Sequence, residues 1–402
     1  MKNRNLTLLL SGQLVSQTGD KLYMLALAFM VLNITGSASK MGLVFCAGIL
    51  PLVTVGLFSG VAVDRIDRKK IIVFTDLLRG VIVSAVSLLY YQGRLTFGVI
   101  LLSQVLLGIN SAFFNPTIPS VIPMIVQKSE LSRANAKTQF VSGFSTIAGP
   151  ALGGVLVSLY GYLFVFALNA ASYFISALFE GFLKIPSTKR SPHAPIHHAF
   201  NEGYRHIVSD QKLLIILLMV FIIHFFVGSI EVCIPVIANL LPGNAPLNLG
   251  YIQTTFGAGA VVMALLLSCR SIDGKESLTL FTAVASIGLL LGLIGLCGFA
   301  QVGIAAMLAL FFLFNASIIL AGTSFQSLIQ KHSDPSMTGR MFGVVSSVGN
   351  FSIPLAMLLY GLLLEYIDTY LLICVSGMLI VLVSGLSFFA YGKVENRVIS
   401  SC

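Results

Sequence analysis

The chain has 402 residues, of which 56% are hydrophobic and only 10% are charged. Soluble domains carry about 25% charged residues, so this composition excludes an ordinary soluble fold and makes lipid the expected surroundings of most of the chain. The formal net charge of +9 does not indicate a nucleic-acid partner, because the basic residues lie in short segments between long uncharged stretches.

Long stretches of the chain contain no Asp, Glu, Lys or Arg. They are residues 41–63, 95–127, 138–179, 232–269, 277–330, 341–364 and 369–392. A helix of roughly 20 apolar residues spans a bilayer core about 30 Å thick, so the two longest stretches are expected to hold two helices each, with turns at the glycines near 160 and 298. Helix is the expected form because lipid offers no partner for bare backbone groups, and these stretches lack the alternation typical of a barrel.

The predicted fold is therefore an all-α membrane protein with twelve transmembrane helices. In chain order, the expected helices are about 6–33, 39–62, 71–92, 96–117, 135–159, 161–183, 212–239, 249–269, 277–298, 302–328, 341–365 and 369–391. The basic start of the chain and the leucines after it resemble a signal peptide, but no small-residue cleavage site follows. We therefore expect an uncleaved first helix.

Basic residues alternate between the predicted loops. The two ends of the chain and every second loop carry most of them, whereas the opposite loops carry only Lys40 and Arg94. By the positive-inside rule, this pattern predicts that both termini are cytoplasmic and that the number of helices is even. The expected location is the cell membrane, as a multi-pass protein.

The longest polar stretch, 184–211, divides the chain nearly in half. We expect an N-terminal six-helix bundle at 1–183, this stretch as a cytoplasmic linker, and a C-terminal six-helix bundle at 212–402. Short patterns recur at an offset near half the chain length; for example, Pro150 recurs as Pro354. A duplicated unit of this kind places a substrate path between the two bundles.

The loop after the second predicted helix carries a glycine, an Asp-Arg pair four and five residues later, and a basic cluster. Its members are Gly60, Asp64, Arg65, Asp67, Arg68, Lys69 and Lys70. This pattern resembles the loop signature of the major facilitator superfamily, and the resemblance implies a gating loop. Gly60 lets helices approach closely, and Asp64 is suited to accept from the N-terminus of a facing helix. The plainer alternative is a solvated loop that only sets topology.

The fifth predicted helix carries a run of small residues around a proline. They are Ser145, Gly149, Pro150, Gly153 and Gly154. The stripe permits tight helix packing, and the proline removes one backbone hydrogen bond. It is similar to the Gly-Pro motif of the family's antiporters, with simple helix packing as the alternative. The segments 131–136 and 338–343 are similar to those of macrolide-efflux and siderophore-export members.

The sequence departs from the family's pattern in the fourth helix. Proton-coupled exporters of this family often carry an arginine there, but no basic residue lies between Arg94 and Lys128, and Gln104 or Leu107 stands near the expected place. This departure weakens the expectation of that route of proton coupling and leaves the fold unaffected.

Polar residues interrupt the first predicted helix near its middle. Asp20 and Lys21 lie there, and Gln13, Gln17 and Asp20 share one helical face. An ionisable residue at the bilayer centre costs roughly 2.5–3.5 kcal/mol on insertion scales, so such a residue indicates a function. We expect this face to line a central cavity with Asp20 exchanging protons. A satisfied ion pair, with Lys21 or with another helix, is the alternative.

The seventh predicted helix supplies a second candidate. Glu231 follows His224 by two turns on the same face, so both are expected at the cavity, although Glu231 also fits a solvated helix end and His224 a packed, hydrogen-bonded ring. Asp76 and Arg79, three residues apart at the start of the third helix, are expected to form a local ion pair that supports the loop.

Motifs of enzymes are absent from the sequence: it has no HExxH, no phosphate loop and no GxSxG. The six cysteines form no CxxC pair, and we expect most of them to be small core residues because they lie in apolar runs. We expect no cofactor and no metal. The linker histidines favour a solvated loop; they are His193, His197, His198 and His206.

The resemblance and the polar residues together predict a secondary active exporter. We expect a monomer that exchanges protons for a lipophilic small molecule, such as a macrolide, by alternating access. One alternative is a siderophore or other metabolite exporter of the same superfamily. The other is a non-transporting membrane sensor or scaffold.

Overall fold

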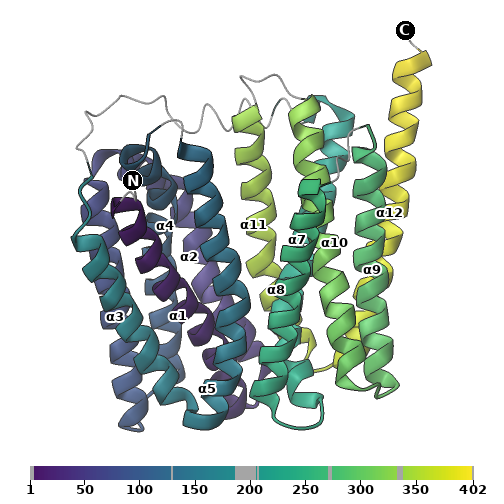
Figure 1. The fold of residues 1–402 in the computed structure, drawn as a ribbon. Coiled ribbons are helices and arrows are strands. Elements are labelled where there is room, and N and C mark those ends of the chain that lie inside the picture. The colour runs from purple at the N-terminus through teal and green to yellow at the C-terminus, as the bar shows by residue number, and fades with distance from the viewer. Residues whose placement is uncertain are drawn as a thin grey trace. The chain divides into compact units, whose positions relative to one another are not determined.

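The computed structural model describes residues 4–127, 130–185, 205, 208–269, 274–332 and 338–400. Side chains at 57, 58, 60–65, 132, 268, 330–332, 338–340, 342, 343, 346 and 395–400 are not described. Every long element in the described ranges is a helix (Figure 1). The fold is the predicted all-α membrane fold.

The first half of the chain forms five continuous helical elements. They are α1 (Arg4–Thr35), α2 (Ala38–Arg65), α3 (Arg68–Tyr91), α4 (Phe97–Ile125) and α5 (Leu131–Gly181). The element α5 contains two helical halves that meet at Gly161, whose φ is 76°. Glycine adopts such a left-handed φ without steric cost, and the turn predicted near residue 160 lies here.

The second half contributes six helices. They are α7 (Gln211–Leu240), α8 (Ala245–Cys269), α9 (Glu276–Phe299), α10 (Ile304–His332), α11 (Thr338–Leu363) and α12 (Thr369–Ser400). With the two halves of α5 counted separately, the described residues hold the twelve helical segments that were predicted.

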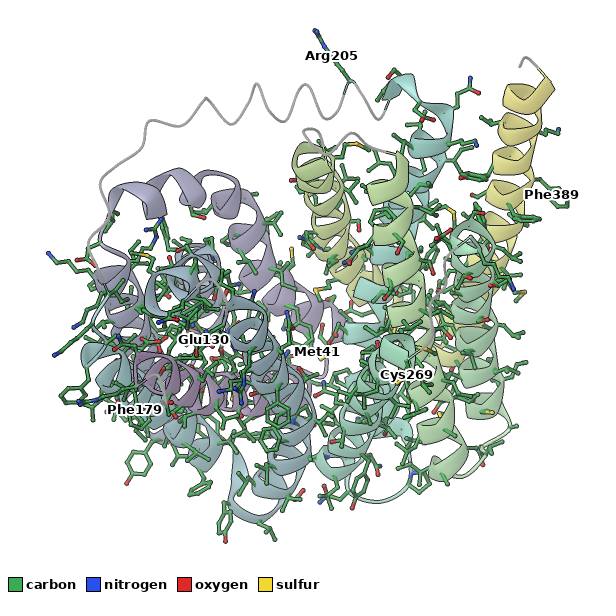
Figure 2. All side chains as sticks on the ribbon, turned by 45° about the horizontal axis from the view of Figure 1, so that its top comes forward. Met41, Glu130, Phe179, Arg205, Cys269 and Phe389 are labelled. Atoms are coloured by element: carbon green, nitrogen blue, oxygen red, sulfur yellow. The ribbon has the colours of Figure 1, made fainter. Side chains whose placement is uncertain are left out.

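Helix length and composition agree with a membrane setting. Among the described residues, nine helices are long and apolar enough to cross a bilayer, and 347–363 in α11 is a shorter apolar segment. Large apolar side chains are exposed on the outer faces; Figure 2 shows Phe389 projecting away from α12, with 70% of its surface exposed. Lipid is the solvent that such a surface fits.

Side-chain caps explain where several helices begin. Asp67 precedes α3, and its Oδ1 accepts from the backbone N–H of Lys69 at 2.8 Å. Asp368 caps α12 by accepting from the N–H of Tyr370 at 2.9 Å. The third helix therefore starts at Arg68, three residues before the predicted start at 71, because the cap satisfies its first backbone donors.

The helices form two compact units. One contains residues 1–192 and 237–254, and the other contains 193–236 and 255–402. The first unit therefore includes α1 to α5 together with the turn between α7 and α8. Most of the predicted linker, including His193, His197, His198 and His206, lies outside the described residues.

Both units contain a helix crossing in which a glycine meets backbone. A Cβ on Gly108 of α4 would lie 2.1 Å from the carbonyl oxygen of Gly48 in α2, and a Cβ on Gly259 of α8 would lie 2.1 Å from the carbonyl oxygen of Phe312 in α10. Only glycine allows this approach, which is how membrane helices maximise their packing.

Candidate functional site

A buried ion pair lies in the third and fourth turns of α3. Asp76 is 0% exposed and Arg79 is 4% exposed. Nη1 of Arg79 lies 3.5 Å from Oδ1 of Asp76, one turn along the helix. The predicted pair is present, and its burial shows that it belongs to the interior of the first unit.

The guanidinium of Arg79 also contacts two other helices. Its Nη2 donates to the hydroxyl of Ser111 in α4 at 2.9 Å. Its Cζ lies 4.3 Å from the ring centre of Phe114 in α4 and 5.7 Å from that of Tyr173 in α5. Both rings therefore offer the cation an electrostatically favourable face. A buried arginine thus lies against the fourth helix, although the fourth helix has no basic residue of its own.

Asp20 of α1 joins the same group. The hydroxyl of Tyr173 donates to Oδ1 of Asp20, and Asp20 interacts electrostatically with Arg79. Helices α1 and α5 approach closely here because residue 19 is a glycine. A Cβ on Gly19 would lie 2.4 Å from the hydroxyl oxygen of Ser172 in α5. A glycine next to the carboxylate therefore allows α1 to reach α5.

Glu180 completes the group and was not anticipated. It is 0% exposed, and neither carboxyl oxygen has a hydrogen-bond partner among the described residues. It interacts electrostatically with Asp76 and Arg79 and lies beside Ser176. We call Asp20, Asp76, Arg79, Tyr173 and Glu180 the charge cluster from here on.

Sequence reasoning missed Glu180 because it ends the uncharged stretch 138–179 and so looked like a helix boundary. A signal was available, since Glu180 follows Ser176 by four residues and Tyr173 by seven. This spacing places all three on one helical face. The sequence does not specify which helices pack together, and it is the packing of α3 against α5 that brings Asp76 and Arg79 next to that face.

The other predicted polar residues of α1 have separate surroundings. Gln13 is buried, and its Oε1 has no partner in the part of the chain that the structure describes. Gln17 is half-buried. Lys21 is exposed, and its Cβ lies against Gly149 of α5, where an added Cβ would be 2.3 Å away.

The predicted residues of α7 belong to the second unit. Nδ1 of His224 lies 2.9 Å from the carbonyl oxygen of Val220, one turn back. His224 borders a cavity of about 270 Å³ whose polar lining includes Thr323 and Gln326 of α10. Glu231 is exposed.

The predicted gating loop is mostly helical: Gly60, Asp64 and Arg65 lie in the last turns of α2, and only residues 66 and 67 separate α2 from α3. The side chains of Gly60, Asp64 and Arg65 lie outside the described residues. Arg68 donates from Nη1 to the sulfur of Met124 in α4 at 3.3 Å, which ties the start of α3 to the end of α4. Lys69 borders a groove of about 1010 Å³ between α3 and α4, whose remaining lining is mostly apolar.

The small residues of α5 contact helices on two sides. The hydroxyl of Ser145 lies 3.1 Å from that of Thr18 in α1, and a Cβ on Gly153 would lie 3.5 Å from Leu22. The same motif also contacts α8.

On this second face of α5, a Cβ on Gly154 would lie 2.7 Å from the carbonyl oxygen of Pro246. The backbone of Pro150 also packs closely on α8, because its carbonyl oxygen would lie 2.9 Å from a Cβ on Gly250. The motif therefore packs α5 between α1 and the start of α8.

A bundle of long apolar helices with apolar outer faces defines the protein as a polytopic membrane protein. A family model described as "Transmembrane secretion effector" matches residues 1–400. The chain therefore belongs to this family of the major facilitator superfamily, and it is a transporter and not an enzyme.

Relatives with curated descriptions match nearly the whole chain. It is 27% identical to the uncharacterized MFS-type transporter YfiS of Bacillus subtilis (strain 168), over 98% of this chain and 95% of that protein. It is 24% identical to macrolide efflux protein A of Streptococcus pyogenes, over 93% of each. Relatives of this kind handle small molecules in a membrane.

Solved structures agree on the fold. A bacterial homologue of the iron transporter ferroportin, in an inward-facing state, aligns with a TM-score of 0.76 and 14% identity, covering 98% of this chain and 99% of that one. The POT family transporter PepTSo aligns with a TM-score of 0.78 and 10% identity over 99% of each. At these identities the likeness concerns the fold alone.

Proposed function

We propose that this chain exports lipophilic small molecules in exchange for protons. The observation that carries the proposal is the charge cluster, in which three carboxyl groups face one guanidinium inside a membrane helix bundle. The export direction is supported by the names of relatives, among them macrolide efflux protein A and the multidrug efflux pump Tap of Mycolicibacterium fortuitum.

Charge balance explains why the charge cluster suits proton exchange. If all three carboxyl groups were ionised, the single guanidinium would leave excess negative charge in a buried site. Uncompensated buried charge costs several kcal/mol per ion, so neutralisation by bound protons is favoured. A site whose charge state is balanced by protons can change that state when one group is exposed to water.

The proposed cycle is alternating access between the two units. Asp20 binds a proton from outside, the substrate leaves, and the transporter returns to its inward-open state, where the proton is released. A membrane potential of 100 mV supplies about 2.3 kcal/mol per charge moved, which is sufficient to bias the cycle. Cytoplasmic termini and a monomeric state are parts of this proposal, as are roles for the loop at Gly60–Lys69 and for His224 and Glu231.

Export of a natural metabolite is the second candidate. This candidate is favoured by the similarity to the putative bacilysin exporter BacE of Bacillus subtilis, which is 25% identical over 85% of this chain. A more anionic metabolite would require basic residues on its path, and Lys21 is the exposed candidate in α1.

The test is accumulation of radiolabelled erythromycin in inverted membrane vesicles with an imposed pH gradient, acidic inside. We expect the parent chain to accumulate the drug and Asp20→Asn to lower accumulation at least tenfold, because the variant cannot release a proton. Glu130→Gln, which removes an exposed carboxyl group, is the matched control and should behave as the parent does. Equal accumulation by the parent and Asp20→Asn would remove Asp20 from the coupling mechanism.

A further inference from the structure

The carboxyl group of Glu180 has no role in the cycle described so far, yet it is fully buried with both oxygens unpartnered among the described residues. We propose that Glu180, together with Asp76 and Ser176, forms a second proton-binding site that receives the proton from Asp20 through the interior of the first unit. This inference rests on the proposed function, since Asp20 must first bind a proton.

The oxygen atoms at this site have one nearby hydroxyl donor, that of Ser176, for two carboxyl groups. Oδ2 of Asp76, the hydroxyl of Ser176 and both oxygens of Glu180 are buried without a hydrogen-bond partner in the described part of the chain. Ionised carboxylates only accept hydrogen bonds, whereas a protonated carboxyl group supplies one donor. The Ser176 hydroxyl can donate to only one carboxyl group at a time, so a proton on Glu180 supplies a second O–H, and Asp76 or Ser176 is placed to accept from it.

The surrounding helices close this site. A Cβ on Gly12 of α1 would lie 3.0 Å from the hydroxyl of Ser176, so α1 packs tightly over this part of α5. The neighbouring Phe179 lies at the outer edge of the unit (Figure 2), whereas Glu180 is turned inward. Helix packing therefore keeps the carboxyl group away from solvent, beside Arg79 and Ser176.

The charge cluster extends along the helix axes of the first unit. Asp20 lies near the middle of α1, and Glu180 is the last residue but one of α5. Tyr173 and Glu180 are two helical turns apart, about 10 Å along the axis. The cluster therefore connects the middle of the bilayer to one end of the helices, which is cytoplasmic in the proposed orientation.

The charged and titratable groups that face this route come from three elements. They are Asp20 from α1, Asp76 and Arg79 from α3, and Tyr173 and Glu180 from α5. Transfer breaks an O–H bond at Asp20 and forms one at Glu180, with no change of oxidation state. Arg79 keeps its protons; because it interacts with all three carboxyl groups, it compensates whichever one is ionised.

The first experiment needs no variant. Dicyclohexylcarbodiimide reacts with protonated carboxyl groups in apolar surroundings, so treatment of the detergent-purified parent protein should label Glu180, with less labelling at alkaline pH. Mass spectrometry of the fragments identifies the site. Glu130, which is exposed, should stay unlabelled. An absence of label at Glu180 at every pH, with label on other carboxyl groups, would overturn the second site.

The second experiment separates proton coupling from substrate movement. In proteoliposomes, Glu180→Gln should retain erythromycin counterflow, which needs no net proton movement, while accumulation driven by a pH gradient falls at least tenfold. Glu130→Gln should match the parent in both assays. Parental accumulation by Glu180→Gln would refute the relay and leave the proposed function intact. Failure of the parent to accumulate any drug would reject both.

Discussion

At the scale of single residues, the site depends on one tyrosine hydroxyl and one guanidinium. Tyr173 donates to Asp20, and its ring lies beside Arg79. The pair Asp76–Arg79 could be predicted from its spacing in α3. The partner of Asp20 could not, because the pattern within α1 does not specify which helix packs against it. The sequence analysis also missed Glu180 as an interior residue, although its spacing from Tyr173 and Ser176 was a signal, because a charge at the end of an apolar stretch usually lies in solvent.

The first residue-scale prediction concerns Tyr173→Phe. The substitution removes only the hydroxyl group and takes the donor from a half-buried oxygen of Asp20, and loss of one hydrogen bond typically costs about 1 kcal/mol. We expect a lower thermal unfolding midpoint in detergent. Tyr366, which is 85% exposed, provides the matched control, and Tyr366→Phe should leave the midpoint unchanged. Equal midpoints for the two variants would show that the Tyr173 hydroxyl contributes nothing to stability.

At the scale of helices, glycine contacts decide which elements meet. The sequence predicted where the helices lie, because uncharged stretches must be long enough to cross lipid, but it ended two of them early: α4 continues to Ile125 and α12 to Ser400, past the predicted ends at 117 and 391. It placed the start of α3 three residues late, because the capping bond from Asp67 extends the helix towards its N-terminus. It did not predict which small residues lie at crossings, since Gly48, Gly108 and Gly259 look like any other glycine in an apolar run.

The helix-scale prediction compares two glycines of α4. A Cβ on Gly108 would lie 2.1 Å from the carbonyl oxygen of Gly48, whereas a Cβ on Gly98 meets nothing within 4 Å. Gly108→Ala should therefore force α2 and α4 apart and cost about 1–3 kcal/mol. Gly98→Ala should be neutral or slightly stabilising. The measurement is the thermal unfolding midpoint of each purified variant, and similar midpoints would argue that this crossing is loose.

At the scale of the whole molecule, the chain combines the fold of the superfamily with a cluster of charged residues inside its first unit. Composition and the resemblance were sufficient to predict the all-α membrane fold and the family. They were not sufficient to predict the charge cluster: the fourth helix lacks the arginine that the resemblance implies, and the members of the cluster come from α1, α3 and α5. The structure contains a guanidinium in contact with that helix all the same, supplied by Arg79 of α3. Arg79 thus places a buried cation beside the fourth helix, although that helix has no basic residue of its own.

The central claim is that the charge cluster exchanges protons for substrate, and proton movement driven by substrate tests it most directly. Proteoliposomes loaded with erythromycin and a pH-sensitive dye are diluted into drug-free buffer without an imposed pH gradient. The account predicts a proton flux opposite to the drug flux in the parent, unchanged in Glu130→Gln and lost in Asp20→Asn. Drug efflux from the parent without any accompanying proton flux would contradict it.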